Sequence, residues 1–106
     1  MAHAAVEVNS EAEFDQFLSN NQFVVIDFYA DWCGPCKAFA PDFENFAKAN
    51  TNIKFLKVNV DNQEEIAVMY DVKAMPTFTF IKNKTTVKTQ VGAKKEEFEA
   101  NLKLLA

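Results

Sequence analysis

The chain has 106 residues, of which 49% are hydrophobic and 25% charged, and this predicts one domain, residues 1–106, with a single core. A net charge of −4, with lysines scattered among threonines and acids, argues against nucleic-acid binding. No apolar run approaches the roughly 18–20 residues that cross a bilayer, because Asp27 interrupts the longest candidate. We therefore expect neither a nucleic-acid nor a membrane partner.

The N-terminal part of the chain alternates strand and helix patterns. Residues 6–8 predict a short strand, and Ser10 with Glu13 three residues later forms a capping-box pattern. Apolar residues at helical spacing then predict a helix over about 11–20. The near-continuous apolar run 23–29 is typical of a strand covered on both faces, as in a parallel sheet.

The middle of the chain repeats this alternation. Aromatic residues at spacings of four, three and four predict a helix over about 35–49 that packs on a sheet. Residues 55–60 predict another buried strand. A short helix should follow around residues 66–70, with Asn62 or Asp61 as its cap.

The C-terminal part predicts a hairpin and a last helix. Threonine and phenylalanine alternate over 77–80, and residues 85–91 can pair with them. The last helix should bury Phe98, Leu102 and Leu105. The resulting order, β-α-β-α-β-α-β-β-α, predicts an α/β fold with helices on both sides of a mixed sheet.

The only two cysteines, Cys33 and Cys36, stand where the second predicted strand meets the helix after it. Residues three apart on a helical turn are about 5–6 Å apart at Cβ, which is near enough for a disulfide. The ring closed is too short to stabilise the fold greatly, so redox chemistry is favoured over a structural role. Open α/β sheets place their chemistry at such strand ends. A lone C-x-x-C without a secretory signal in residues 1–7 indicates a reducing compartment, and we expect the cytoplasm.

Two other classes of function remain open from this motif. A C-x-x-C pair is half of a zinc or iron–sulfur site, but His3 is the only other soft ligand in the chain, so we expect no metal. Alternatively, the fold is a binding module whose thiols only set its state. That module would keep its partner after both cysteines are replaced with serine.

The residue types around the motif suggest distinct roles. Cys33 lies at a predicted helix N-terminus, where free N–H groups favour a thiolate, so we expect it to be the exposed nucleophile and Cys36 an inward resolving thiol. Asp27 lies in an apolar strand, and burial should raise its pKa toward that of a base for Cys36. Alternatively, Asp27 forms a structural ion pair with Lys57. Pro35 limits flexibility between the thiols or merely starts the helix.

Over essentially its full length the chain resembles the thioredoxin family. The matching segments are Asp27-Phe28, Trp32-Cys33-Gly34-Pro35-Cys36-Lys37, Pro41, Lys57-Val58-Asn59-Val60-Asp61, Met75-Pro76-Thr77 and Gly92-Ala93. The resemblance implies a sheet of about five strands flanked by about four helices. It also implies a protein-disulfide reductase without a bound cofactor, recharged by NADPH-dependent thioredoxin reductase. Expected substrates are proteins such as peroxiredoxin or ribonucleotide reductase, and the expected state is a monomer.

The resemblance also assigns site residues. The catalytic set would be Cys33, Cys36, Asp27, Lys57, Gly34 and Pro35. The substrate surface would be Trp32, Met75, Pro76, Gly92 and Ala93, with a cis Met75-Pro76 bond beside the disulfide and the Met75 backbone free to pair with substrate. Without the resemblance, Trp32 would more simply belong to the core.

The chain departs from the family pattern at three points. Tyr29 stands where many bacterial members have Trp, and Lys84 stands where the last hairpin commonly has Gly. That turn must then rely on Asn83, which tolerates the left-handed region, or adopt another type. The extra regulatory cysteines of some animal members are missing. Protein disulfide isomerase domains look similar, but they usually carry Cys-Gly-His-Cys and a secretory signal.

Overall fold

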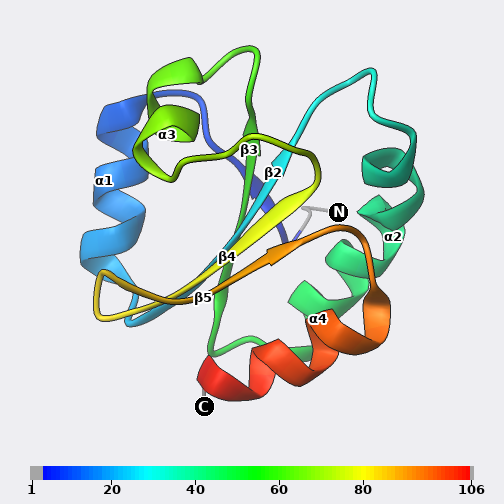
Figure 1. Cartoon of the computed structure of the whole chain (residues 1–106). Coiled ribbons are helices and arrows are strands. Elements are labelled where there is room, and N and C mark those ends of the chain that lie inside the picture. The colour runs from blue at the N-terminus through cyan, green and yellow to red at the C-terminus, as the bar shows by residue number, and fades with distance from the viewer. Residues whose placement is uncertain (1–3, 106) are drawn as a thin grey trace.

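A mixed five-stranded sheet forms the centre of the computed structural model, which describes residues 4–105 (Figure 1). The strands are β1 (Val6–Glu7), β2 (Phe23–Tyr29), β3 (Lys54–Asn59), β4 (Thr77–Lys82) and β5 (Thr85–Val91). They lie in the order β1-β3-β2-β4-β5. The first three run parallel, whereas β4 pairs antiparallel with both β2 and β5. The predicted mixed sheet is confirmed, with β3 starting and ending one residue earlier than expected.

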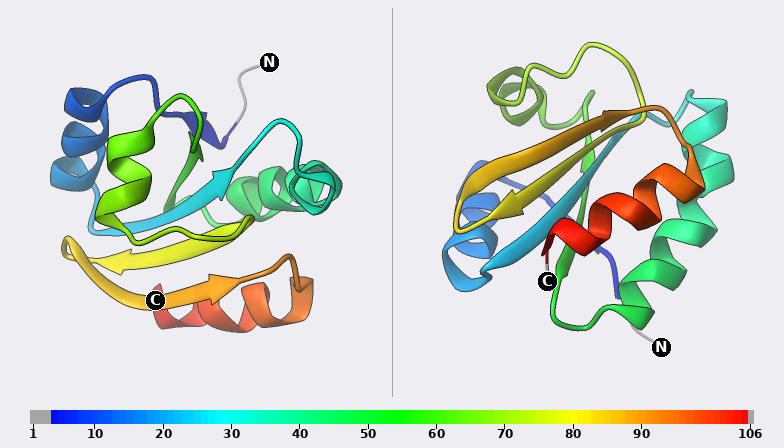
Figure 2. Two further views of the ribbon diagram at one scale, coloured as in Figure 1. Left: turned by 45° about the horizontal axis from the view of Figure 1, so that its top comes forward. Right: turned by 60° about the horizontal axis from the view of Figure 1, so that its bottom comes forward.

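Four helices cover the two faces of this sheet. They are α1 (Glu11–Asn20), α2 (Gly34–Ala49), α3 (Glu64–Met69) and α4 (Lys95–Leu102), and a 3-10 turn (Lys103–Leu105) extends the last one. Helices α1 and α3 lie on one face, and α2 and α4 lie on the other (Figures 1 and 2). Helix α2 begins at Gly34 and continues past Pro41.

Each face of the sheet carries its own apolar core. The core under α2 and α4 is rich in phenylalanine, with Phe39, Phe43, Phe55, Phe78, Phe80 and Phe98. The core under α1 and α3 is mainly aliphatic, with Val24, Ile26, Leu56, Val58 and Ile66 beside Phe14 and Phe28. Successive residues of a strand point to opposite faces. Asp27 therefore shares the α2 face with Val25, and this places its carboxyl group under the helix that carries the cysteines.

The predicted start of α1 is confirmed. The Ser10 hydroxyl accepts a hydrogen bond from the Glu13 backbone N–H at 3.1 Å. The Glu13 carboxylate accepts from the N–H of Asn9 at 2.9 Å. The first bond satisfies a donor that the first helical turn leaves free, and the second ties the residue before the N-cap to the helix.

The predicted cap of α3 is wrong. Gln63 occupies the N-cap position and makes no side-chain capping bond, so neither Asn62 nor Asp61 caps the helix. The Asn59 side-chain oxygen instead accepts from the N–H groups of Asp61 and Asn62, at 2.9 and 3.3 Å. The Asn59 side chain at the end of β3 thus stabilises the turn that contains the two residues predicted to cap the helix.

The β4–β5 hairpin closes with Asn83 and Lys84 as its two turn residues. Both have positive φ, 52° for Asn83 and 66° for Lys84, the pattern of a type I′ turn. The expected reliance on Asn83 is confirmed. Lys84 adopts the left-handed conformation as well, although glycine would do so at lower cost.

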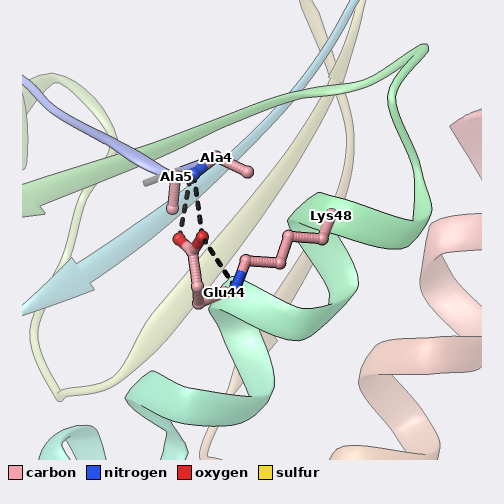
Figure 3. A network of polar contacts seen from close by, with 4 residues as sticks. All are labelled: Ala4, Ala5, Glu44 and Lys48. Carbon is pink, nitrogen blue, oxygen red and sulfur yellow. Dashed lines mark hydrogen bonds and ion pairs between the residues drawn. The ribbon is translucent and has the colours of Figure 1, made fainter. Parts of the chain in front are cut away.

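Glu44 of α2 fastens the start of the described chain to the helix. Its carboxylate accepts hydrogen bonds from the backbone N–H groups of Ala4 and Ala5, at 2.8 and 3.0 Å (Figure 3). Lys48, one turn later, lies 4.0 Å from the same carboxylate. These contacts hold the segment that leads into β1 at the edge of the sheet.

Replacing Glu44 with alanine is expected to lower the free energy of unfolding by about 1–3 kcal/mol, because two backbone donors lose a charged acceptor. Urea unfolding of the disulfide form at pH 7 measures the change. Lys48→Ala is the control, and it should change stability by less than about 1 kcal/mol because its ion pair is long and exposed. Equal losses of unfolding free energy in the two variants would contradict the stabilising role given to the hydrogen bonds of Glu44.

Candidate active site

The Cys33–Cys36 disulfide lies where β2 gives way to α2. The two Cα atoms are 5.3 Å apart, and the Cys33 N–H donates to the Ala30 carbonyl at 3.1 Å in the connecting turn. The expected position of the pair at a strand end is confirmed. Because the two cysteines are only one helical turn apart, opening and closing their disulfide requires only a local change and no movement of the sheet.

Cys33 is the N-cap of α2. Its sulfur accepts a hydrogen bond from the Cys36 backbone N–H at 3.2 Å, with Pro35, which has no N–H, in the first turn of the helix. A helix N-terminus favours negative charge on the group that caps it. When the disulfide is reduced, this arrangement favours a thiolate on Cys33 over one on Cys36.

The expected exposure of Cys33 is wrong. Cys33 and Cys36 are 5% and 4% exposed, so they differ little in burial. Ala30 packs with both cysteines, and Met75 from a distant part of the chain lies against them. Cys33 is therefore part of a small apolar cluster to which segments far apart in sequence contribute. The difference between the thiols comes from the helix cap rather than from exposure.

Asp27 is a buried carboxylic acid behind the disulfide. It is 2% exposed, and its Oδ1 atom has no hydrogen-bond partner in the described structure. Burial raises the pKa of Asp27 from 3.8 to about 7, against the lowering effect of the Lys57 ammonium and with a smaller raising effect of Glu7. A pocket of about 140 Å³ is lined by Asp27, Cys36 and Lys57 among others. The predicted rise in the pKa of Asp27 is confirmed, and the acid shares a pocket with Cys36.

Lys57 stands between two acids in the register of the sheet. It is aligned with Asp27 on β2 and with Glu7 on β1. Among the described residues, no ion pair within 4.0 Å joins Lys57 to Asp27. Instead, Lys57 Nζ lies 5.1 Å from the centre of the Tyr29 ring, and the Tyr29 hydroxyl donates to the Glu7 carboxylate. Lys57 thus acts on Asp27 through its field and leaves Oδ1 available.

Trp32 lies on the surface rather than in the core. It is 68% exposed, and its indole Nε1 donates to the Asp61 carboxylate at 3.1 Å. The Met75–Pro76 bond is cis, as expected from the resemblance. Met75 is partly buried and packs against the cluster of Ala30 and the two cysteines, so this segment lies next to the active-site cluster.

Gly92 and Ala93 complete the predicted surface set. The Gly92 N–H donates to the Pro76 carbonyl at 2.9 Å, which ties the loop after β5 to the cis-proline segment. Gly92 has φ of 101°, a conformation that favours glycine. Ala93 packs partly against the core under α2 and α4. The structure therefore joins Gly92 directly to Pro76, while Ala93 packs against the core under α2 and α4.

Sequence reasoning overlooked two groups near the site. The Asp61 carboxylate accepts a hydrogen bond from the Trp32 indole, a role that neither the predicted helix cap nor the resemblance assigned to it. Glu7 meets Lys57 and Tyr29 across the sheet. No local pattern signals either contact, because both depend on which strands become neighbours.

The metal alternative finds no support among residues 4–105, which contain no group of three or more His, Cys, Asp or Glu side chains arranged to hold an ion. His3, the other soft ligand considered for such a site, lies outside the described residues. None of the described helices has the length and apolarity of a membrane span.

A disulfide at a strand-to-helix junction, with one sulfur capping the helix and a buried acid behind it, defines a thiol-disulfide oxidoreductase on an α/β sheet. The thioredoxin family model matches residues 5–104. The chain belongs to the thioredoxin family. It is a protein-disulfide reductase whose redox group is the Cys33–Cys36 pair.

Curated relatives and solved structures agree with this assignment. Thioredoxin 1 of Plasmodium falciparum is 45% identical over 86 residues, which cover 81% of this chain and 83% of that protein. Thioredoxin-1 of Schizosaccharomyces pombe is 42% identical over 97 residues, or 92% and 94% of the two chains. The solved Plasmodium falciparum thioredoxin superposes with a TM-score of 0.91 at 40% identity and covers 94% of this chain and 98% of its own.

Proposed function

We propose that Cys33 attacks a disulfide of a target protein and that Cys36 completes the exchange. The Cys33 thiolate forms a bond to one substrate sulfur, and the other substrate sulfur leaves as a thiolate that takes up a proton. Cys36 then passes its proton to Asp27 and attacks Cys33 Sγ. The bond between Cys33 Sγ and the substrate breaks, and that substrate sulfur leaves as a thiolate that takes up a proton. Cys33–Cys36 becomes the disulfide, and the substrate has gained two electrons and two protons. The hydrogen bond from the Cys36 N–H to Cys33 Sγ is the observation that carries this assignment.

Asp27 is the proton acceptor in this scheme. A pKa of about 7 lets the carboxylate take a proton near neutral pH, and the shared pocket gives a route from Cys36 directly or through water. Lys57 tunes that pKa from the neighbouring strand. Gly34 and Pro35 keep the two thiols within one turn, so the resolving attack is intramolecular and has a high effective molarity.

The docking surface consists of Trp32, Met75, Pro76, Gly92 and Ala93. Its support is the exposed indole of Trp32 and the contact of Met75 with the cysteines. An extended substrate segment adds to the Met75 backbone, in the manner of a strand joining an edge. Apolar side chains around the disulfide then exclude water from the exchange.

A thioredoxin reductase reduces the disulfide again with two electrons from NADPH. The chain forms one domain, residues 1–106, and acts as a monomer in the cytoplasm. Family membership supports the reductase as partner. Peroxiredoxin and ribonucleotide reductase are proposed substrates. A solved relative with a TM-score of 0.89 and 34% identity comes from work on a yeast mitochondrial peroxiredoxin resolved via glutathione and thioredoxin systems.

Replacing Cys36 with serine should stop the cycle after its first step and accumulate one mixed disulfide per protein. The serine hydroxyl cannot displace the substrate sulfur from Cys33. Non-reducing electrophoresis and intact mass measure the adduct formed with a disulfide-bonded protein such as insulin. The matched control, Cys33→Ser, should form no adduct on this pathway. Sustained multiple turnover by Cys36→Ser would refute the resolving role.

A further inference from the structure

Two buried side-chain amides have no role in the proposed disulfide exchange. Gln90 of β5 is 1% exposed and Asn101 of α4 is 8% exposed. The Asn101 amide Nδ2 donates to Gln90 Oε1 at 3.0 Å. Gln90 Nε2 in turn donates to the carbonyl oxygens of Gly92 and Lys94, at 3.1 and 3.2 Å. Buried polar groups are costly without partners, so this network favours one arrangement of the chain.

Both hydrogen bonds that Gln90 Nε2 donates end on the loop after β5. They hold the carbonyls of Gly92 and Lys94 from the strand side, while the Gly92 N–H reaches the Pro76 carbonyl at 2.9 Å. Lys94, the N-cap of α4, makes no side-chain capping bond. The loop therefore depends on Gln90 for its orientation. A continuous path of hydrogen bonds runs from Asn101 through Gln90 and Gly92 to Pro76.

Other side chains in this region do not provide the same connection. Thr79 of β4 is also buried, but its hydroxyl has no hydrogen-bond partner in the described structure. Thr89, which pairs with Thr79 across the two strands, is exposed. Gln90 is thus the side chain of β5 that joins the loop to α4.

We propose that Gln90, oriented by Asn101, is a positioning residue that holds the 92–94 loop against Pro76 and so sets the affinity for protein disulfides. The proposal rests on the proposed docking surface. A loop that is already ordered loses less conformational entropy when a substrate binds. Because neither amide touches the cysteines, the network acts on binding and leaves the exchange itself unchanged.

Gln90→Met tests the role, since methionine has a similar length but neither donates nor accepts as the amide does. Prereduced protein is mixed with increasing insulin in stopped flow without reductase, which separates the half-saturating concentration from the maximal rate. We expect the half-saturating concentration to rise about tenfold, while the maximal rate stays unchanged. The redox potential of Cys33–Cys36, measured against glutathione, should also stay unchanged.

Thr79→Val is the matched control, because it removes a buried polar group that holds no loop. It should bind insulin as the wild type does. Asn101→Leu keeps Gln90 but removes its orienting donor, and it should raise the half-saturating concentration in the same direction. This second variant decides the question if Gln90→Met does not fold.

Trp32→Ala separates the two proposals. If it raises the half-saturating concentration and neither amide variant does, the docking surface stands and the role of Gln90 is overturned. If none of the three variants raises it, the docking surface fails as well. A fall in maximal rate at unchanged half-saturation, or an equal rise in Thr79→Val, would also overturn the proposed role of Gln90.

Discussion

Replacing Cys33 with serine is expected to lower turnover at least about a thousandfold in an assay that couples NADPH oxidation to insulin reduction through thioredoxin reductase. Serine cannot form the mixed disulfide, and loss of a nucleophile removes most of the rate enhancement of a covalent mechanism. The fall in NADPH absorbance measures the rate. In the wild type, omitting the reductase should stop NADPH oxidation, and this tests the proposed recharging step.

Two results would contradict these assignments. Substantial turnover by Cys33→Ser would place the nucleophile elsewhere. Wild-type protein that binds a partner but never reduces its disulfide, and still binds it after both cysteines are replaced with serine, would favour the binding-module alternative. Cys36→Ser is the matched comparison, since it retains the helix-capping sulfur of Cys33.

Asp27→Asn is expected to remove a large pH-dependent loss of stability. The pKa of Asp27 is about 7 in the folded chain and 3.8 in its unperturbed state. Between these values the folded state binds the proton that the unfolded state has released, so wild-type stability falls as pH rises. The shift predicts a loss of about 2–3 kcal/mol between pH 5 and pH 8. Asparagine does not titrate, so the variant should lack this loss.

Urea unfolding of the disulfide form at several pH values measures this difference. Asp31→Asn is the control, because Asp31 is an exposed carboxylate that lines the same pocket, and it should follow the wild-type profile. Parallel stability profiles for wild type and Asp27→Asn would show that Asp27 does not titrate between pH 5 and pH 8. The proton-acceptor role fails separately if Asp27→Asn leaves the pH dependence of insulin reduction unchanged.

The sequence predicted the fold well because its periodicities are strong. The apolar run 23–29 fits a strand buried on both faces, and the aromatic stripe of α2 fits a helix buried on one face, so each pattern is compatible with few other structures. The predicted cap of α3 is wrong because the Asn59 side chain binds the N–H groups of Asp61 and Asn62 and holds both residues in the turn before the helix, which begins only at Glu64. These contacts depend on the path of the turn, which residue types alone do not specify.

The candidate site was only partly predictable for a similar reason. The helix cap at Cys33 and the burial of Asp27 follow from local pattern, and both are confirmed. The cluster that buries Cys33 is packed by Val60 and Met75, which lie on other segments of the chain and which the local pattern does not specify. The loop contacts of Gln90 likewise require β5 and α4 to be placed in space.

The row Glu7, Lys57 and Asp27 also constrains how the strands pair. These three residues face one another on neighbouring parallel strands, on the side of the sheet that α2 covers. A slip of one residue turns every side chain of a strand to the opposite face. A β3 strand slipped by one residue would turn Lys57 toward the apolar core under α1 and α3. The correct alignment of β3 therefore keeps Lys57 beside Glu7 and Asp27 and away from that core.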